Sequence, residues 1–417
     1  MDLRSRPPAP SASPSASAEA PTYWLSTVDI NAFAGQGALP PRTDVAVVGG
    51  GLMGVATAYW LARRGLAPLL LERSRIGCGA SGRNAGMFLP GQHPLEDATL
   101  VRSVLADEHI DADHATPGHL SLAATPATFE LYRAEVDRRP ATGAPLHALD
   151  RAGCEELLGL RIAAHFAGGR WLPDGGAIQP ARFVYGLAAA AVRHGARIAP
   201  DTEVTGVRRT GTDGYTVHTR RGPVHAGQVV LACNSAIARL VAALAPLIRP
   251  VRGQVMATRP LPPVFRVGLA VDFGNVYWRQ NPEGVIVIGG LRDRATGDAE
   301  RTDVVALNES VQHALDAFLP AAFPGFPTFT VGWRWASIMD VTADGRPLIG
   351  AVPGADGLWV IAGFGGHGLP AGLGAGRALA DSIVTGQPVA ALAPFDPGRP
   401  SAAHDPADRP TVKVTQT

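Results

Sequence analysis

One segment near the N-terminus constrains the fold of this chain more than any other. Residues 45–48 (VAVV) form an apolar run without alternation, which predicts a parallel strand buried on both faces. The glycine-rich turn GGGLMG follows, then a helical stretch of small and apolar residues, and then a second apolar strand at residues 69–71 that leads into Glu72. This order predicts the βαβ unit of a dinucleotide-binding domain.

The glycines of this turn have separate expected roles. Gly49 permits the tight turn, Gly51 lets the backbone approach a pyrophosphate, and Gly54 lets helix and strand pack closely. The helix N-terminus supplies free amide groups and a positive dipole end for the phosphates. Glu72 is spaced to accept hydrogen bonds from a ribose 2′-hydroxyl, which indicates an unphosphorylated ADP moiety. The fingerprint alone leaves NAD and FAD open, and we expect cofactor contacts from Gly49, Gly51, Leu52, Met53, Gly54, Glu72 and Arg73.

A second glycine-rich loop separates these two cofactors. Residues 79–86 read GASGRNAG, where a nicotinamide-binding domain would proceed to a third parallel strand. With this loop the chain resembles the FAD-dependent amine and amino-acid oxidoreductases of the D-amino-acid oxidase (DAO) superfamily, closest to its γ-glutamylputrescine oxidase-like and glycine–sarcosine oxidase-like members. Further segments match that family over about residues 43–388, namely residues 175–182, 202–204, 342–350 and 362–368.

The resemblance implies FAD as the cofactor and assigns residues to it. The loop would pass close to the isoalloxazine, and the backbone at Val204 would contact the adenine. The turn at residues 365–368 leads into a helix, so it would aim amide groups and a positive dipole end at the charge that a flavin acquires on reduction. The implied contacts are Gly79, Ala80, Ser81, Arg83, Asn84, Ala85, Gly86, Met87, Val204, Gly365, Gly366, His367, Gly368 and Leu369.

The resemblance implies two domains and a fold of the α/β class, α+β overall. A Rossmann-like FAD-binding domain of the glutathione-reductase type would comprise residues 43–100, 165–235 and 340–388. A mostly antiparallel β substrate domain with helices would interrupt it at residues 101–164 and 236–339, and residues 276–280 and 285–288 predict a hairpin there. Residues 1–42 would be a mostly disordered extension and residues 389–417 a polar tail.

The resemblance implies that the flavin carries out the chemistry. A hydride would pass from the carbon beside a neutral amine to flavin N5, and the resulting imine would be hydrolysed by water. No side-chain base is obligatory in this reaction, and the sequence shows no catalytic triad. We expect His367 beside the flavin, and Tyr277 and Arg279 on one face of a strand that lines the site or packs at the domain interface.

Two positions bear on the substrate. Met339 stands where glycine- and D-amino-acid-oxidase-like members hold the substrate carboxylate with an arginine, and Pro370 stands where sarcosine-oxidase-like members carry a lysine. The sequence therefore favours either an amine or an amino acid gripped by another arginine, such as Arg279, Arg252 or Arg334.

The electron acceptor stays open between dioxygen and another acceptor. Lys413 is the only lysine, so no lysine outside the tail is available to promote the reaction with dioxygen. The alternatives are a D-amino-acid-, glycine- or sarcosine-type dehydrogenase that uses an electron acceptor other than dioxygen, and the flavin-binding subunit of a hetero-oligomeric oxidase. A nicotinamide-dependent dehydrogenase is disfavoured by the two flavin-facing segments.

Composition narrows the partners and the compartment. The net charge is +1, with no basic block, which argues against nucleic acid. Three cysteines form neither a disulfide framework nor a metal motif, so we expect a cytoplasmic protein without a metal. Residues 357–376 carry no formal charge, but eight of the twenty are glycine, and we expect a strand, a turn and a helix there in place of a membrane span.

Overall fold

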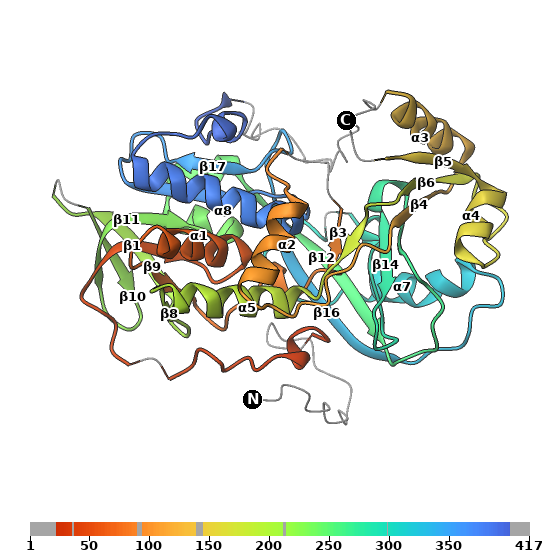
Figure 1. The fold of residues 1–417 in the computed structure, drawn as a ribbon, viewed down its shortest axis with the longest axis horizontal. Coiled ribbons are helices and arrows are strands. Elements are labelled where there is room, and N and C mark those ends of the chain that lie inside the picture. The colour runs from red at the N-terminus through yellow and green to blue at the C-terminus, as the bar shows by residue number, and fades with distance from the viewer. Residues whose placement is uncertain are drawn as a thin grey trace.

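The computed structural model describes residues 22–35, 37–89, 94–138, 145–211, 214–297 and 299–400. Two large sheets lie side by side, one with helices on its face and one that is mostly antiparallel, as Figure 1 shows. The expected α/β fold with two sheet-based parts is confirmed.

The first sheet is built on the predicted βαβ unit. Its central strand pairs in parallel with both neighbours, and residues 45–48 are buried as their unbroken apolar character requires. The strand order is β17–β18–β11–β1–β2–β8, with β10 pairing to β11 and β9 to β10. The strands are β1 (Arg42–Val48), β2 (Leu69–Leu71), β8 (Arg197–Ala199), β9 (Val204–Arg209), β10 (Tyr215–Thr219), β11 (Val224–Leu231), β17 (Leu348–Ala351) and β18 (Leu358–Ala362).

Three helices pack together over this sheet. Helix α1 (Leu52–Arg63) lies between α5 (Pro180–Arg193) and α8 (Gly368–Thr385), and their apolar faces form a common core with β1 and β2 (Figure 1). Helix α2 (Ala98–Asp107) also contacts α8. The N-termini of α1 and α8 are close to each other, because the methyl group of Met53 lies against Gly368 and the side chain of Leu52 against Gly372.

The second sheet has the order β16–β12–β15–β14–β13–β4–β6–β5, and among these pairs only β13 and β4 run parallel. Strands β14 and β15 form the predicted hairpin, which is confirmed. The strands are β4 (His119–Ala123), β5 (His147–Asp150), β6 (Gly168–Leu172), β12 (Arg249–Thr258), β13 (Gly268–Val271), β14 (Val276–Gln280), β15 (Ile286–Gly290) and β16 (Val331–Val341).

Helices cover the outer face of the second sheet. Helix α7 (Glu309–Ala322) packs on it through an apolar cluster that includes Trp278 and Leu315. Helices α3 (Pro126–Arg138) and α4 (Arg151–Leu158) lie at the β5–β6 end. A ribbon of β3 (Met87–Phe88) and β7 (Gly176–Ala177) stands between the two sheets, and the remaining short helices are η1 (Leu25–Thr27), η2 (Ala80–Gly82), η3 (Asn234–Ala236), α6 (Ile237–Leu240), η4 (Ala242–Leu247), η5 (Asp272–Gly274), η6 (Arg292–Arg294) and η7 (Ala390–Phe395).

The structure shifts two of the expected domain boundaries. Strand β6 belongs to the second sheet, so the chain returns to the first sheet after residue 172 and not at residue 165. The first segment of the part built on the first sheet extends past residue 100, because α2 packs on α8. Both shifts follow from long-range pairing that the local sequence pattern does not encode.

The two ends also differ from expectation where they are described. Residues 22–28 are not disordered, because Trp24 is fully buried and Leu25 nearly so. Leu392 and Phe395 of η7 are buried, so the polar tail begins later than residue 389. Residues 1–21 and 401–417 lie outside the described residues.

The uncharged stretch at residues 357–376 forms β18, a glycine turn and the start of α8, as expected. Among the described helices, none combines the length and the apolar character needed to cross a bilayer.

Candidate functional site

The turn between β1 and α1 needs glycine for steric reasons. Gly49 has a φ of 113°, and a Cβ on it would lie 2.5 Å from the carbonyl oxygen of Ala232. A Cβ on Gly54 would overlap the carbonyl oxygen of Gly49. Only glycine therefore allows the helix to start this close to the strand, with Gly51 at its N-terminal cap.

Glu72 closes the end of β2 next to this turn. Its carboxylate accepts hydrogen bonds from the amides of Gly50 (2.7 Å) and Ser74 (2.9 Å), and burial raises the pKa of the carboxyl group. The amide of Thr202 donates to the Glu72 carbonyl oxygen at 2.7 Å, which brings the start of β9 at Val204 to the same edge. The side chain of Arg73 is exposed. The residues expected at the ADP end thus lie together.

Four consecutive carbonyl oxygens of the loop at residues 79–86 accept hydrogen bonds from side chains outside the loop. Gly82 accepts from Thr22 Oγ1 (3.1 Å) and Arg83 from Trp335 Nε1 (2.8 Å). Asn84 accepts from Trp24 Nε1 (2.7 Å) and Ala85 from Arg279 Nε (2.8 Å). The donors come from the N-terminal segment, β16 and β14, so three distant segments fix the path of this loop.

The polar side chains of the loop also act on its backbone. Ser81 Oγ accepts from the amide of Leu52 (2.8 Å), which ties the loop to the first turn of α1. Asn84 donates to the carbonyl oxygens of Ala80 and Ser81 and accepts from the amide of Gly86. Arg83 is buried and donates to the carbonyl oxygens of Cys78 and Ala336. The loop then leaves through Met87 into β3.

The turn at residues 363–368 is fixed by a buried carboxylate at the end of β16. Asp340 Oδ2 accepts from the amide of Gly363 (2.9 Å), and its carbonyl oxygen accepts from the amide of Gly365 (2.9 Å). Burial raises the pKa of the Asp340 carboxyl group to about 6. Gly365 has a φ of 58°, and a Cβ on it would meet no atom within 4 Å. The turn therefore presents bare backbone to open space ahead of α8.

His367 caps the N-terminus of α8, directly before Gly368 and Leu369. Its ring is accessible to solvent from the open side, yet protein surrounds it closely elsewhere, and this desolvation lowers the pKa of the imidazole. A neutral imidazole is therefore favoured at neutral pH.

One face of the second sheet borders these segments, and we call it the flavin-side face. It carries Trp335 and Met339 from β16 and Tyr277 from β14, which alternate with residues that point to α7. A Cβ on Gly366 would lie 3.0 Å from the Met339 sulfur, so the sheet touches the turn at residues 363–368. Tyr277 lies across Gly289 of the neighbouring strand, where a Cβ would be 2.9 Å from its hydroxyl oxygen.

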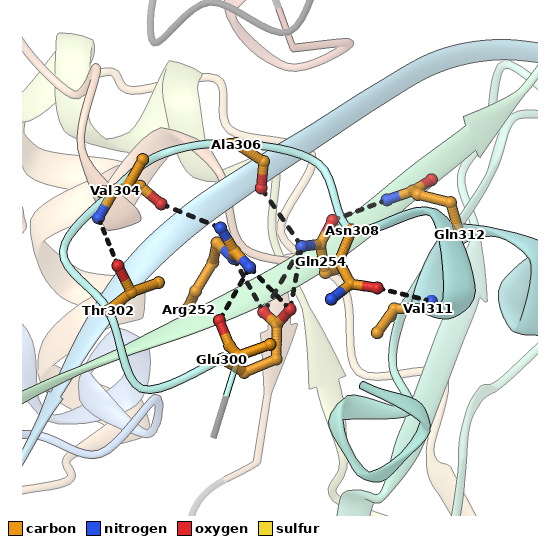
Figure 2. A network of polar contacts seen from close by, with 10 residues as sticks. Arg252, Gln254, Glu300, Thr302, Val304, Ala306, Asn308, Val311 and Gln312 are labelled. Atoms are coloured by element: carbon orange, nitrogen blue, oxygen red, sulfur yellow. Dashed lines mark hydrogen bonds and ion pairs between the residues drawn. The ribbon is translucent and has the colours of Figure 1, made fainter. Parts of the chain in front are cut away.

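The three arginines considered as substrate clamps already have partners. Arg252 forms a buried ion pair with Glu300 (3.0 Å), within the network with Gln254 and Gln312 that Figure 2 shows. Arg334 makes a bidentate pair with Asp316 at 2.8 Å. Arg279 lies on the flavin-side face, but its Nε and Nη2 donate to the carbonyl oxygens of Ala85 and Ile178 (2.8 Å each). It also lies 4.8 Å from the centre of the Trp24 ring.

Sequence reasoning missed several members of this site. Trp24 and Thr22 belong to a segment that composition assigned to a disordered extension, and the aromatic pair Tyr23–Trp24 was the available signal. Asp340 carried no motif, since a buried carboxylate bound to backbone amides is set by tertiary contacts. Arg292, discussed below, follows a strand end that only the structure defines.

The arrangement fits an extended dinucleotide with a flavin ring. The glycine turn and the α1 N-terminus suit a pyrophosphate, and Glu72 at the end of β2 suits a ribose. A Cβ on Gly79 or on Gly365 would meet no atom of the described residues within 4 Å, so the backbone at both positions is open to a ligand. Within the described residues, no group of three or more His, Cys, Asp or Glu side chains converges to hold a metal.

Known proteins share this fold and these segments. The family model described as FAD dependent oxidoreductase (DAO) matches residues 44–382. Sarcosine oxidase subunit beta from Rhizobium meliloti is 29% identical over 85% of this chain and 88% of its own length. Glycine oxidase from Geobacillus kaustophilus is 28% identical over 85% of this chain and 96% of its own. The crystal structure of glycine oxidase from Geobacillus kaustophilus superposes with a TM-score of 0.75 at 27% identity, covering 86% of this chain and 99% of that one. The chain therefore belongs to the DAO family of FAD-dependent oxidoreductases, and FAD is its cofactor.

Proposed function

We propose that this flavoenzyme oxidises the carbon–nitrogen bond of a small amine or amino acid held between the flavin-side face and the turn at residues 363–368. The observation that carries the proposal is the contact between Met339 and Gly366, which brings the second sheet against the turn at residues 363–368. The names of the relatives support the reaction class, since glycine and sarcosine are both α-amino acids.

Bound FAD supplies the hydride acceptor for this reaction. The protein contributes position and electrostatics. The amides of residues 365–368 and the N-terminal end of α8 favour negative charge beside them. Tyr277 and Met339 form the wall that orients the substrate and excludes water from one side, while the buried Trp335 holds the loop at residues 79–86.

His367 and Arg279 take different roles in this proposal. A neutral His367 accepts a hydrogen bond from the substrate nitrogen and adds no positive charge beside it, so it is compatible with the uncharged amine whose C–H bond is broken. Arg279 acts as a positioning residue that holds the loop at residues 79–86. Val204, at the edge beside Glu72, is proposed to contact the adenine through its backbone.

Anaerobic absorption spectroscopy tests the proposal. The FAD-loaded protein is titrated with sarcosine, glycine, D-alanine and putrescine derivatives, and we expect the visible flavin bands to bleach with at least one of them. Return of colour in air distinguishes the acceptors: a prompt return indicates dioxygen and a slow return another electron acceptor. A protein that holds FAD and bleaches with no amine or amino acid would contradict the proposed reaction.

A matched pair of variants tests the cofactor site. A side chain at Gly54 would overlap the Gly49 carbonyl, whereas a Cβ at Gly37 would meet nothing within 4 Å. We expect Gly54→Val to purify without FAD and Gly37→Val to bind it as the unaltered protein does. Equal FAD content in the two variants would overturn the assigned site.

A second candidate is that the chain is the flavin-binding subunit of a larger oxidase. The name of the subunit beta relative, of which 88% is covered, favours it. Native mass measurement of the enzyme purified from its source tests this assembly, and a homogeneous species of one chain type would contradict it.

We also propose a reducing, cytoplasmic location. Its support is that Cys78, Cys154 and Cys233 are all unpaired thiols.

A further inference from the structure

Arg292 differs from the other arginines around the site. Arg252, Arg279 and Arg334 donate hydrogen bonds to carboxylates, to backbone carbonyl oxygens or, at Arg334, also to the side-chain amide of Gln312. In the part of the chain that the structure describes, Arg292 has no carboxylate within 4.0 Å, and its one polar contact joins Nη1 to the Met339 sulfur at 3.9 Å. A thioether is a weak acceptor and does not balance a guanidinium charge. Among the described residues this cation therefore has no counter-charge.

The backbone before Arg292 is held in an unusual conformation. Strand β15 ends at Gly290, and Leu291 follows with a φ of 54°, in the left-handed region that costs a non-glycine residue about 1–2 kcal/mol. The buried Leu291 side chain and a hydrogen bond from its amide to the Asn275 carbonyl oxygen (2.6 Å) hold this turn. Strain of this kind persists where the surroundings enforce it, and here it sends the next side chain toward β16.

Arg292 lies near Met339, Tyr277 and His367, which the proposed function places at the substrate. Burial raises the pKa of the Tyr277 hydroxyl and lowers the pKa of the His367 imidazole, and the positive charge of Arg292 favours a lower pKa at both groups. Its field therefore reaches Tyr277 on β14 and His367 at the start of α8. The Met339 sulfur lies between Arg292 and the backbone of Gly366. In the described residues the Tyr277 hydroxyl has no hydrogen-bond partner, which leaves a second polar group available at the same place.

The sheet residues that Tyr277 and Met339 lie against are both glycines. Gly289 lies under the Tyr277 ring, and Gly253 of β12 lies under the methyl group of Met339, where a Cβ would be 3.2 Å away. Glycine at both positions allows Tyr277 and Met339 to lie close to the sheet. The half-buried Arg292 lies next to them, with its Nη1 against the Met339 sulfur.

We propose that Arg292 binds the carboxylate of the substrate, which makes the substrate an α-amino acid or an N-alkyl amino acid with a free carboxylate and excludes simple amines. The proposal rests on the proposed function. Position 339 of β16 is a methionine and carries no charge. Arg292, which follows β15, places a positive charge next to that methionine. A planar guanidinium matches a carboxylate with two parallel hydrogen bonds, and an amine without an acid would leave the charge uncompensated.

Binding of a carboxylate without an oxidisable amine tests this step apart from catalysis. The probe is (methylthio)acetate, a carboxylate whose thioether sulfur stands in place of the amine nitrogen, and we call it methylthioacetate. It is titrated against the oxidised FAD-loaded protein, and its Kd is read from the change in the visible flavin spectrum. We expect Arg292→Met to raise the Kd about 30- to 100-fold, as for loss of a charge-assisted hydrogen bond of roughly 2–3 kcal/mol. Arg292→Lys, which keeps the charge and loses the fork, is expected to raise it about 5- to 10-fold.

The matched control is Arg294→Met on the same turn. The Arg294 side chain is 62% exposed and lies 3.9 Å from Asp293, so we expect its removal to leave the Kd unchanged. The kinetic counterpart compares an amino acid that bleaches the flavin with its methyl ester. Arg292→Met should raise KM for the acid and leave KM for the ester within about twofold.

The outcomes separate this inference from the proposed function. An amino acid that bleaches the flavin, together with an Arg292→Met variant that binds methylthioacetate as tightly as the unaltered protein, would overturn the inference and leave the function standing. Bleaching by amines in preference to acids would also overturn it. Failure of every amine and amino acid to bleach the flavin overturns the proposed function itself.

Discussion

The two faces of the second sheet treat buried charge in opposite ways. On the face toward α7, Arg252 and Arg334 each have a carboxylate partner, and the network around Glu300 in Figure 2 satisfies the polar groups with one another. On the flavin-side face, Arg279 and Arg292 have no carboxylate within 4.0 Å among the described residues.

This difference separates charges that hold the fold from charges that are available to ligands. A charge in a buried ion pair is not free to bind a ligand, because taking it from its partner leaves that partner unpaired in a medium of low polarity. Arg279 is instead bound to two backbone carbonyl oxygens, so its role is to hold a loop. No residue that the structure describes balances the charge of Arg292, so Arg292 is the one of the four arginines best suited to an anionic ligand.

The largest stability effect is expected on the α7-side face. Glu300→Ala would leave Arg252 buried without its partner, and we expect the free energy of unfolding to fall by about 3–5 kcal/mol in urea denaturation. Asp316→Ala is the control, since the Arg334–Asp316 pair is part-exposed and should lose about 1 kcal/mol or less. Losses of equal size would mean that burial does not distinguish the two pairs.

Asp340 is a buried carboxylate whose partners are backbone amides and not a cation, which makes it the anionic counterpart of Arg279. Burial raises its pKa from 3.8 to about 6. The folded-state pKa lies above the unfolded one, so the cost of ionising Asp340 on folding is small at pH 4, grows between about pH 4 and pH 6, and is complete above about pH 6. We expect Asp340→Asn to gain stability over the unaltered apoprotein by about 2.4 kcal/mol between pH 4 and pH 7.5.

Urea unfolding of the two apoproteins at these pH values measures this gain. Asp356→Asn, at a side chain that is 96% exposed, is the control and should show no such change. A constant difference between Asp340→Asn and the unaltered protein over this pH range would show that Asp340 does not titrate there.

A smaller effect is expected at Arg279. Arg279→Met removes the donors to the carbonyl oxygens of Ala85 and Ile178, and part of that loss is offset because a buried charge is removed as well. We expect a loss of about 2 kcal/mol in the free energy of unfolding and FAD binding weakened about tenfold, measured by fluorescence titration. Unchanged FAD affinity with a raised KM for an amino acid would instead make Arg279 a substrate clamp.

The sequence predicted the parts of this site that depend on local patterns. The unbroken apolar strands, the glycine turns and the hairpin at residues 276–288 each follow from neighbours in the chain. The burial of Trp24 does not, because its partner Asn84 is sixty residues away. The α7-side pairs of Arg252 and Arg334 likewise join strands to a loop and a helix that no spacing connects.

The same limit explains why Arg292 could not be singled out. In the sequence Arg292 and Arg294 flank Asp293, and no local pattern distinguishes one arginine from the other. The end of β15 and the left-handed turn at Leu291 make the difference, since they bring Arg292 to Met339 while Arg294 stays at the surface. Both features are products of sheet pairing.

The smallest stability effect is expected at Arg292, and it completes the comparison of the two faces. Arg292→Gln removes a half-buried charge that no other described group balances, so the free energy of unfolding should change by no more than about 0.5 kcal/mol. The effect of a ligand should be larger than this. Methylthioacetate at a hundred times its Kd should stabilise the unaltered holoenzyme by about 2.7 kcal/mol, and the same concentration should give the variant less than about 1 kcal/mol. A variant that is strongly destabilised without ligand would place Arg292 among the structural charges of the α7-side face, because only a charge that the fold itself uses is missed when no ligand is present.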